Sequence, residues 1–88
     1  MIAKEFTITN KYGIHARPAA LIAKTANRFK STIKVRKDTL EVNGKSIMGI
    51  LMLAAARGNT ITVVADGVDE KEAIESLGEV INMKFDEE

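Results

Sequence analysis

The sequence predicts an α+β fold in which a four-stranded antiparallel sheet carries helices on one face, an open-faced β-sandwich with the order β-α-β-β-α-β-α. The chain has 88 residues, which allows one domain with a single modest core. In some segments apolar and polar residues alternate, which is typical of strands. In the segments between them apolar residues recur at helical spacing. No repeat, low-complexity segment or linker interrupts this pattern, so we expect residues 1–88 to form one domain.

The first part of the chain predicts a strand, a helix and a second strand. Residues 2–9 alternate in part and are rich in β-branched side chains, which favours a strand. From Ala16 onward the apolar residues fall on one face of a helix: Ala19, Ile22, Ala23, Ala26 and Phe29. Ile33 and Val35 then alternate with basic residues, which predicts the second strand.

The middle of the chain predicts a short strand and a short helix. Leu40 and Val42 alternate with polar residues and form the third strand. The Asn43-Gly44 pair is a turn signal, although here it need not close a hairpin. Ser46 is a good candidate for the N-cap of the helix that follows. The apolar residues of that helix have the expected spacing: Ile47, Ile50, Leu51 and Ala54.

The last third predicts a fourth strand and a long helix. Ile61, Val63 and Ala65 alternate with Thr62, Val64 and Asp66, which predicts the fourth strand. Asp69 is the expected N-cap of the helix, with Glu72 as its capping-box partner and Val68 and Ala73 as a hydrophobic staple. The apolar stripe of this helix is the clearest in the chain: Ala73, Ile74, Leu77, Val80 and Ile81.

Composition excludes several kinds of partner and site. The net charge of +1 gives no reason to expect a nucleic-acid or membrane partner. The chain has no cysteine and a single histidine, so disulfides and thiolate sites are excluded, and we expect no metal and no cofactor. The N-terminus is too polar for a signal peptide, and the apolar run at residues 47–56 is shorter than the ~20 residues that span a bilayer. We therefore expect a cytoplasmic protein with no membrane insertion.

The segment YGIHARPAA, residues 12–20, combines the features of an anion site. His15 lies at or beside the N-cap of the predicted helix, and Pro18 is a residue tolerated in a first helical turn. The N–H groups of that turn and the helix dipole favour a bound anion. Arg17 adds a positive charge with forked donors that suit a phosphate group.

The imidazole of His15 could act as a nucleophile at this position. With a reference pKa of about 6.5, a neutral histidine can attack a phosphoryl group near pH 7. The residues alone leave an alternative open, because a lone histidine near a helix start is more often a capping or surface residue. Arg17 by itself is most often a solvated surface residue.

The segments GIHARPAA and GKSIMGIL together closely resemble the HPr family, the histidine-containing phosphocarriers of the bacterial phosphotransferase system. The resemblance covers nearly the whole chain. It implies that His15 accepts a phosphoryl group on Nδ1 from enzyme I, itself charged by phosphoenolpyruvate, and passes it to a histidine or cysteine of an A-type domain of enzyme II. Arg17 would steady the phosphoryl group, and the backbone N–H groups of Ala16 and Arg17 would bind its oxygens. The protein would then be a carrier with a covalent intermediate rather than a stand-alone enzyme.

The same resemblance implies regulation and docking surfaces. In many relatives the serine at the position of Ser46 is modified by an ATP-dependent kinase/phosphorylase, which slows transfer and creates a partner for a catabolite-control transcription factor. The competing interpretation is that Ser46 is only a helix cap. In the family the first helix and the short second helix form the docking surface, although core packing is the alternative for the apolar residues. The predicted docking residues are Ala20, Lys24, Ile47, Met48 and Leu51.

Two alternatives stay open at this stage, and a third is disfavoured. GILMLAAARG is somewhat similar to nitrogen-branch relatives, which pass phosphate among regulatory proteins instead of driving sugar uptake. Tyr12 replaces the small polar residue of many sugar-branch members, which affects the expected geometry beside His15. A binding module with a reversible ligand would use the same anion site without a covalent step. An RNA-binding domain is disfavoured, because the few aromatic residues do not pair into a stacking platform.

Overall fold

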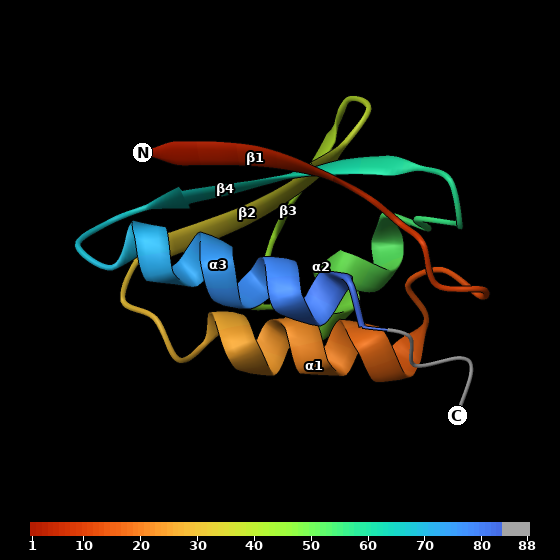
Figure 1. Ribbon diagram of the computed structural model, residues 1–88, viewed down its shortest axis with the longest axis horizontal. Helices are drawn as coiled ribbons and strands as arrows, with labels where there is room; N and C mark the ends of the chain where they lie inside the picture. The colour runs from red at the N-terminus through yellow and green to blue at the C-terminus, as the bar shows by residue number, and fades with distance from the viewer. Residues whose placement is uncertain (84–88) are drawn as a thin grey trace.

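The computed structural model describes residues 1–83 and confirms the predicted fold class and element order. Within these residues an antiparallel sheet of four strands, in the order β1-β4-β2-β3, carries three helices on one face (Figure 1). The elements are β1 Ile2–Thr7, α1 Ala16–Ala26, β2 Thr32–Lys37, β3 Leu40–Asn43, α2 Ile47–Met52, β4 Thr60–Asp66 and α3 Glu70–Ile81.

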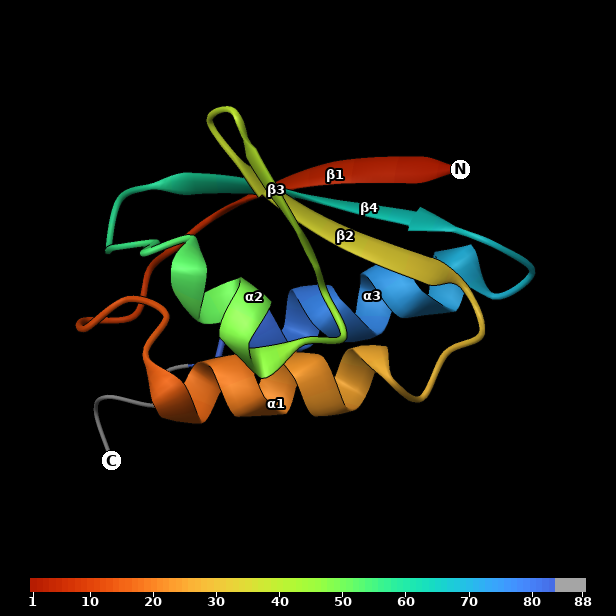
Figure 2. The same cartoon turned by 180° about the vertical axis from the view of Figure 1, so that it is seen from behind.

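Alternation along the strands explains why one face of the sheet is covered and the other is open. In β4, Ile61, Val63 and Ala65 are buried, while the residues between them are exposed or half-buried. The helices α1 and α3 lie side by side across the buried face, and the short α2 packs against α1 and β3 (Figures 1 and 2). The predicted apolar stripe of α3 is buried throughout, as are the apolar residues predicted for α1 from Ala19 to Ala26.

Three element boundaries differ from the expectation. The first strand ends at Thr7, although Ile8 stays buried and its N–H donates to the carbonyl of Asn59 at 2.8 Å. Phe29 lies beyond the C-cap of α1 and packs half-buried against the core. Ala54 lies outside α2 and is exposed, with a positive φ of 49° that is incompatible with a continuing helix.

The start of α3 corrects the predicted capping box and staple. Asp69 is the N-cap, but its carboxylate makes no capping bond and accepts instead from the backbone N–H groups of Lys30 and Ser31 and from the Ser31 hydroxyl. Val68 is 88% exposed and forms no staple. Asp69 therefore ties the α1–β2 connection to α3, a role that depends on residues far away in the sequence.

Folding makes Asp69 a stronger acid, which gives a pH-dependent stability. The Ser31 hydroxyl, followed by the backbone N–H of Lys30, lowers the pKa of Asp69 from its ordinary value of 3.8 to about 2. Because the folded protein binds this proton less tightly than the unfolded chain, the stabilisation is complete above the ordinary pKa. It is lost as the pH falls through about 2.

We expect the Asp69→Asn variant to melt several degrees below the wild type at neutral pH, with the difference shrinking as the pH falls from about 4 to about 2. Thermal melting followed by circular dichroism at several pH values measures this difference. Glu72→Gln is the matched control, since it removes an exposed carboxylate from the same turn of α3 without touching Ser31. A gap between wild type and Asp69→Asn that stays constant over this pH range would contradict the assignment.

Within residues 1–83, no helix is long and apolar enough to span a bilayer.

Candidate functional site

His15 is the N-cap of α1, as the sequence predicts. Its backbone is extended, with φ −104° and ψ −168°, and its carbonyl accepts from the N–H of Ala19 at 2.9 Å. The imidazole makes no capping hydrogen bond to the helix and is half-buried at the surface. The structure therefore does not use this side chain as a helix cap, which was one of the two alternatives that the residues alone left open; the other is a surface residue.

The first turn of α1 presents positive potential beside the imidazole. It contains no acidic residue, and Pro18, which has no N–H, is buried at its inner side. Helix geometry offers the N–H groups of Ala16 and Arg17 no acceptor inside α1, and both residues are exposed. Together with the helix dipole, this turn can stabilise negative charge next to His15.

The loop before His15 is fixed by hydrogen bonds within the loop and by one bond to another part of the chain. The buried Asn10 donates from Nδ2 to the carbonyl of Gly13 at 2.6 Å, and the N–H of Gly13 returns to the carbonyl of Asn10 at 3.1 Å. The N–H of Ile14 donates to the carbonyl of Ala55 at 2.8 Å. The loop thus lies against the α2–β4 connection, which sets the position of the N-terminus of α1 (Figure 2).

Gly13 is required at this turn for two reasons. Its φ is +70°, and a Cβ added there would lie 2.5 Å from the carbonyl oxygen of Ala55. We therefore expect Gly13→Ala to destabilise the fold by about 1–3 kcal/mol, which lowers Tm by roughly 4–8 °C per kcal/mol. Thermal melting of the purified variant measures this loss.

Gly58→Ala is a matched control for this prediction. Gly58 also has a positive φ, of +91°, but a Cβ added there would meet nothing within 4 Å. We expect this variant to lose less stability than Gly13→Ala, because it carries the backbone strain without the close approach. Equal losses of stability in the two variants would show that the close approach to Ala55 does not contribute to the destabilisation.

Tyr12 lies beside His15. The two ring centroids are 6.4 Å apart and the ring planes meet at 77°, an edge-to-face arrangement. The Tyr12 side chain is 64% exposed, so it extends the surface around the imidazole. The sequence marked Tyr12 only as a departure from relatives; the ring contact depends on the turn at Gly13.

Ser46 is the N-cap of α2, as predicted. Its Oγ accepts from the N–H of Gly49 at 3.0 Å, and the residue is half-buried. In α2, Ile50 is buried and Leu51 is half-buried, whereas Ile47 and Met48 are 45% and 70% exposed. This short helix therefore leaves apolar side chains on the surface.

Side chains from other elements hold both ends of α2. Asn27 at the C-cap of α1 donates from Nδ2 to the carbonyl of Lys45 at 2.9 Å, and Lys45 Nζ donates to the carbonyl of Phe29 at 2.8 Å. At the other end, Lys37 Nζ donates to the carbonyl of Leu53 at 3.2 Å. These bonds fix the start of α2, and with it Ser46, against the end of α1.

The predicted docking residues come from two helices that pack against each other. On α1, Ala20 is half-buried and Lys24 is exposed, and their spacing of four places them on one face of the helix. The helix α2 lies beside α1 (Figure 2). Sequence reasoning missed Met52, which is 65% exposed at the end of α2. The signal in the sequence was one more apolar side chain on a helix that is too short to bury all of them.

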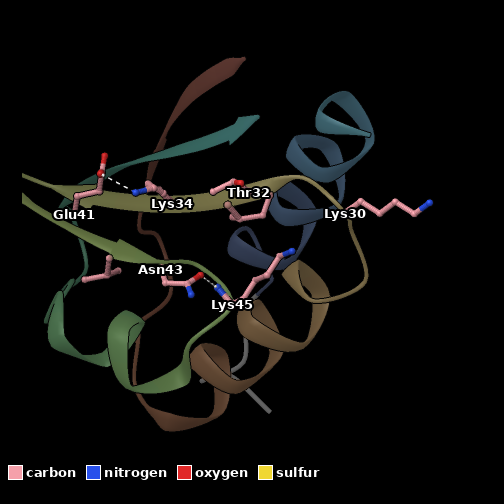
Figure 3. Close-up of a pocket in the computed structure, with 8 residues that line it drawn as sticks. Lys30, Thr32, Lys34, Glu41, Asn43 and Lys45 are labelled. Atoms are coloured by element: carbon pink, nitrogen blue, oxygen red, sulfur yellow. Dashed lines mark hydrogen bonds and ion pairs between the residues drawn. The ribbon is translucent and has the colours of Figure 1, made fainter. Parts of the chain in front are cut away.

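A hollow of about 400 Å³ lies at the β2–β3 edge of the sheet, and none of the predicted site residues lines it (Figure 3). Its cations are already engaged or point away. Lys34 lies 3.7 Å from Glu41, Lys45 Nζ donates to a backbone carbonyl, and Lys30 extends into solvent (Figure 3). In the part of the chain that the structure describes, no group of three or more histidine or acidic side chains could hold a metal ion.

Comparison with known proteins finds relatives over nearly the whole chain. The family model described as "PTS HPr component phosphorylation site" matches residues 2–83. The chain is 43% identical to the phosphocarrier protein HPr of Treponema pallidum over 88 residues, which is all of both chains. It is 49% identical over 77 residues to the HPr-like protein Crh of Halalkalibacterium halodurans, covering 88% of this chain and 92% of that one. The crystal structure of HPr from Thermoanaerobacter tengcongensis superposes with a TM-score of 0.92 at 50% identity, covering 100% of this chain and 99% of that one.

Proposed function

Since this chain belongs to the HPr family of the phosphotransferase system, we propose that it accepts a phosphoryl group on His15 from phosphorylated enzyme I and passes it to A-type domains of enzyme II for sugar uptake. The carrier would work in the cytoplasm. One observation carries the proposal: the single imidazole of the chain stands at the N-terminus of α1 without capping it.

The proposed step is a substitution at phosphorus. A lone pair on Nδ1 of His15 forms the new N–P bond while the donor's bond to phosphorus breaks, and the donor atom keeps that electron pair. No oxidation or reduction is involved. The N–H groups of Ala16 and Arg17, the helix dipole and the Arg17 side chain would stabilise the charge on the transferred oxygens.

Docking would use the surface formed by α1 and α2. Exposed apolar side chains on α2, among them Ile47 and Met48, suit a surface that binds several partners, because methionine adapts its shape. The full set proposed for docking is Ala20, Lys24, Ile47, Met48 and Leu51.

Regulation would act at Ser46. The residue is half-buried at the start of α2 and carries a hydroxyl that a kinase/phosphorylase could modify with ATP. The modified protein would slow its own transfer at His15 and bind a catabolite-control transcription factor. The relative Crh of Bacillus subtilis, described as the catabolite repression HPr, supports a regulatory role in this family. Acid-stable phosphate that a kinase adds to the wild type and not to Ser46→Ala would support this proposal, and labelling of both would contradict it.

The first test is phosphorylation by a defined donor. The protein is incubated with phosphoenolpyruvate and a catalytic amount of enzyme I, and the added group is mapped by intact mass and by its lability in acid. We expect one acid-labile phosphoryl group, located on His15. Absence of label, with an enzyme I active on a control carrier, would contradict the sugar-branch proposal. Label from a nitrogen-branch donor alone would then assign the chain to that branch, and a reversible ligand without phosphohistidine would indicate a binding module.

A further inference from the structure

We propose that Tyr12 is a positioning residue for His15, whose ring restrains the orientation of the imidazole before phosphoryl transfer. The inference rests on the proposed function, since it concerns the same site. Tyr12 takes no part in the bond changes of the proposed transfer, so it would act only through the orientation of His15.

The contact has the geometry of a favourable aromatic pair. A centroid distance of 6.4 Å and an interplanar angle of 77° fall within the range of edge-to-face pairs. The Lys11 ammonium lies 5.3 Å from the centroid of the same tyrosine ring, a cation–π distance. Tyr12 is 64% exposed, so its place beside His15 is not a by-product of packing in the core.

The backbone brings the two rings together and keeps them there. Gly13, with its positive φ, turns the chain between Tyr12 and His15. The reciprocal hydrogen bonds between Asn10 and Gly13 bracket Tyr12, and the bond from Ile14 to Ala55 fixes the residue before His15. Because hydrogen bonds hold the backbone on both sides of Tyr12, the Tyr12 ring lies beside the imidazole at a defined position.

Restraint of the imidazole has a kinetic consequence. A histidine nucleophile attacks in line only when its nitrogen lone pair points at phosphorus, so a contact that favours one side-chain rotamer of the half-buried imidazole raises the reactive population. An aromatic pair of this kind shifts the population toward one orientation by about two- to tenfold. The effect should appear in kcat rather than in KM, because the restraint acts on the reacting group and not on the docking surface.

The test compares Tyr12→Phe, which keeps the ring, with Tyr12→Ala, which removes it without adding a hydrogen-bonding group beside His15. Both substitutions lie at an exposed position, and circular dichroism verifies that each variant folds. In the unphosphorylated protein, we expect Tyr12→Phe to keep the ring-proton shifts of His15 and its nuclear Overhauser contacts to residue 12, and Tyr12→Ala to change these shifts and lose these contacts. For uptake from phosphorylated enzyme I, we expect kcat to fall about two- to tenfold in Tyr12→Ala alone, with KM unchanged.

Other outcomes separate this inference from the proposed function. Unchanged His15 resonances and unchanged kcat in Tyr12→Ala would overturn the inference while leaving the carrier function intact. A change confined to KM would also overturn it, because that result marks Tyr12 as a docking contact. If the wild type takes up no phosphoryl group from any donor, the proposed function fails and this inference fails with it.

Discussion

The His15→Ala variant is expected to fold as the wild type does and to accept no acid-labile phosphoryl group, a complete loss of carrier activity. The loss is complete because the chain contains no second histidine that could substitute as nucleophile. The fold should survive because the imidazole makes no capping bond, and the backbone carbonyl of residue 15 can still accept from the N–H of Ala19. Intact mass spectrometry after incubation with phosphoenolpyruvate and enzyme I measures the loss.

Two controls make this result specific. A melting temperature within a few degrees of the wild type shows that the variant is folded. Phosphorylation at Ser46 by an ATP-dependent kinase, where the wild type accepts it, should be retained, because Ser46 lies on a different helix. Acid-labile label that persists in His15→Ala would contradict the assignment of the nucleophile and point to another residue.

The features that the sequence predicted correctly are those with local causes. The periodicities of α1 and α3 are statements about neighbouring residues, and the stripe around Leu77 is buried as the spacing required. The N-cap positions of His15 and Ser46 follow from residues within one turn of the helix start. The placement of a histidine at the end of a helix could therefore be predicted before any tertiary contact was known.

The features that the sequence missed depend on residues far apart in the chain. Asp69 and Glu72 form a valid capping-box pattern, but the carboxylate of Asp69 bonds Ser31, 38 residues away, because folding brings the α1–β2 connection beside α3. The contact between Tyr12 and His15 likewise requires the turn at Gly13, which is held by Ala55. Local patterns predict where an element starts, while tertiary partners decide which bonds its first residues make.

The proposed transfer site also combines a local feature with contacts between distant residues. The N-terminus of α1 is a local feature, but its position depends on the loop held by Asn10 and by the carbonyl of Ala55. The other end of α1 is tied through Asn27 to Lys45, next to Ser46. The helix α1 therefore connects the proposed transfer site to the start of α2, which gives the proposed regulation at Ser46 a physical route to His15.

Replacement of Arg17 by alanine is expected to lower kcat/KM for uptake from phosphorylated enzyme I on the order of 10²-fold, as loss of one charged donor to a transition state does. The guanidinium would contribute two parallel donors and a positive charge to the transferred oxygens, next to the N–H groups of the first turn. Arg17→Lys should be intermediate, because lysine keeps the charge and loses the planar fork. Steady-state kinetics of phosphoryl uptake measure all three proteins.

Arg36→Ala is the matched control for this series. Arg36 follows the buried Val35 in β2, so it lies on the open face of the sheet, and its guanidinium is 3.9 Å from Glu41. The substitution removes the same charge far from the first turn of α1, and we expect kcat/KM to stay within about twofold of the wild type at moderate salt. If Arg36→Ala and Arg17→Ala lower the rate equally, and added salt abolishes both effects, Arg17 acts through the overall field that attracts the donor. A loss confined to Arg17→Ala that persists in salt instead requires contact with the transferred group, because a direct bond is screened far less than long-range steering.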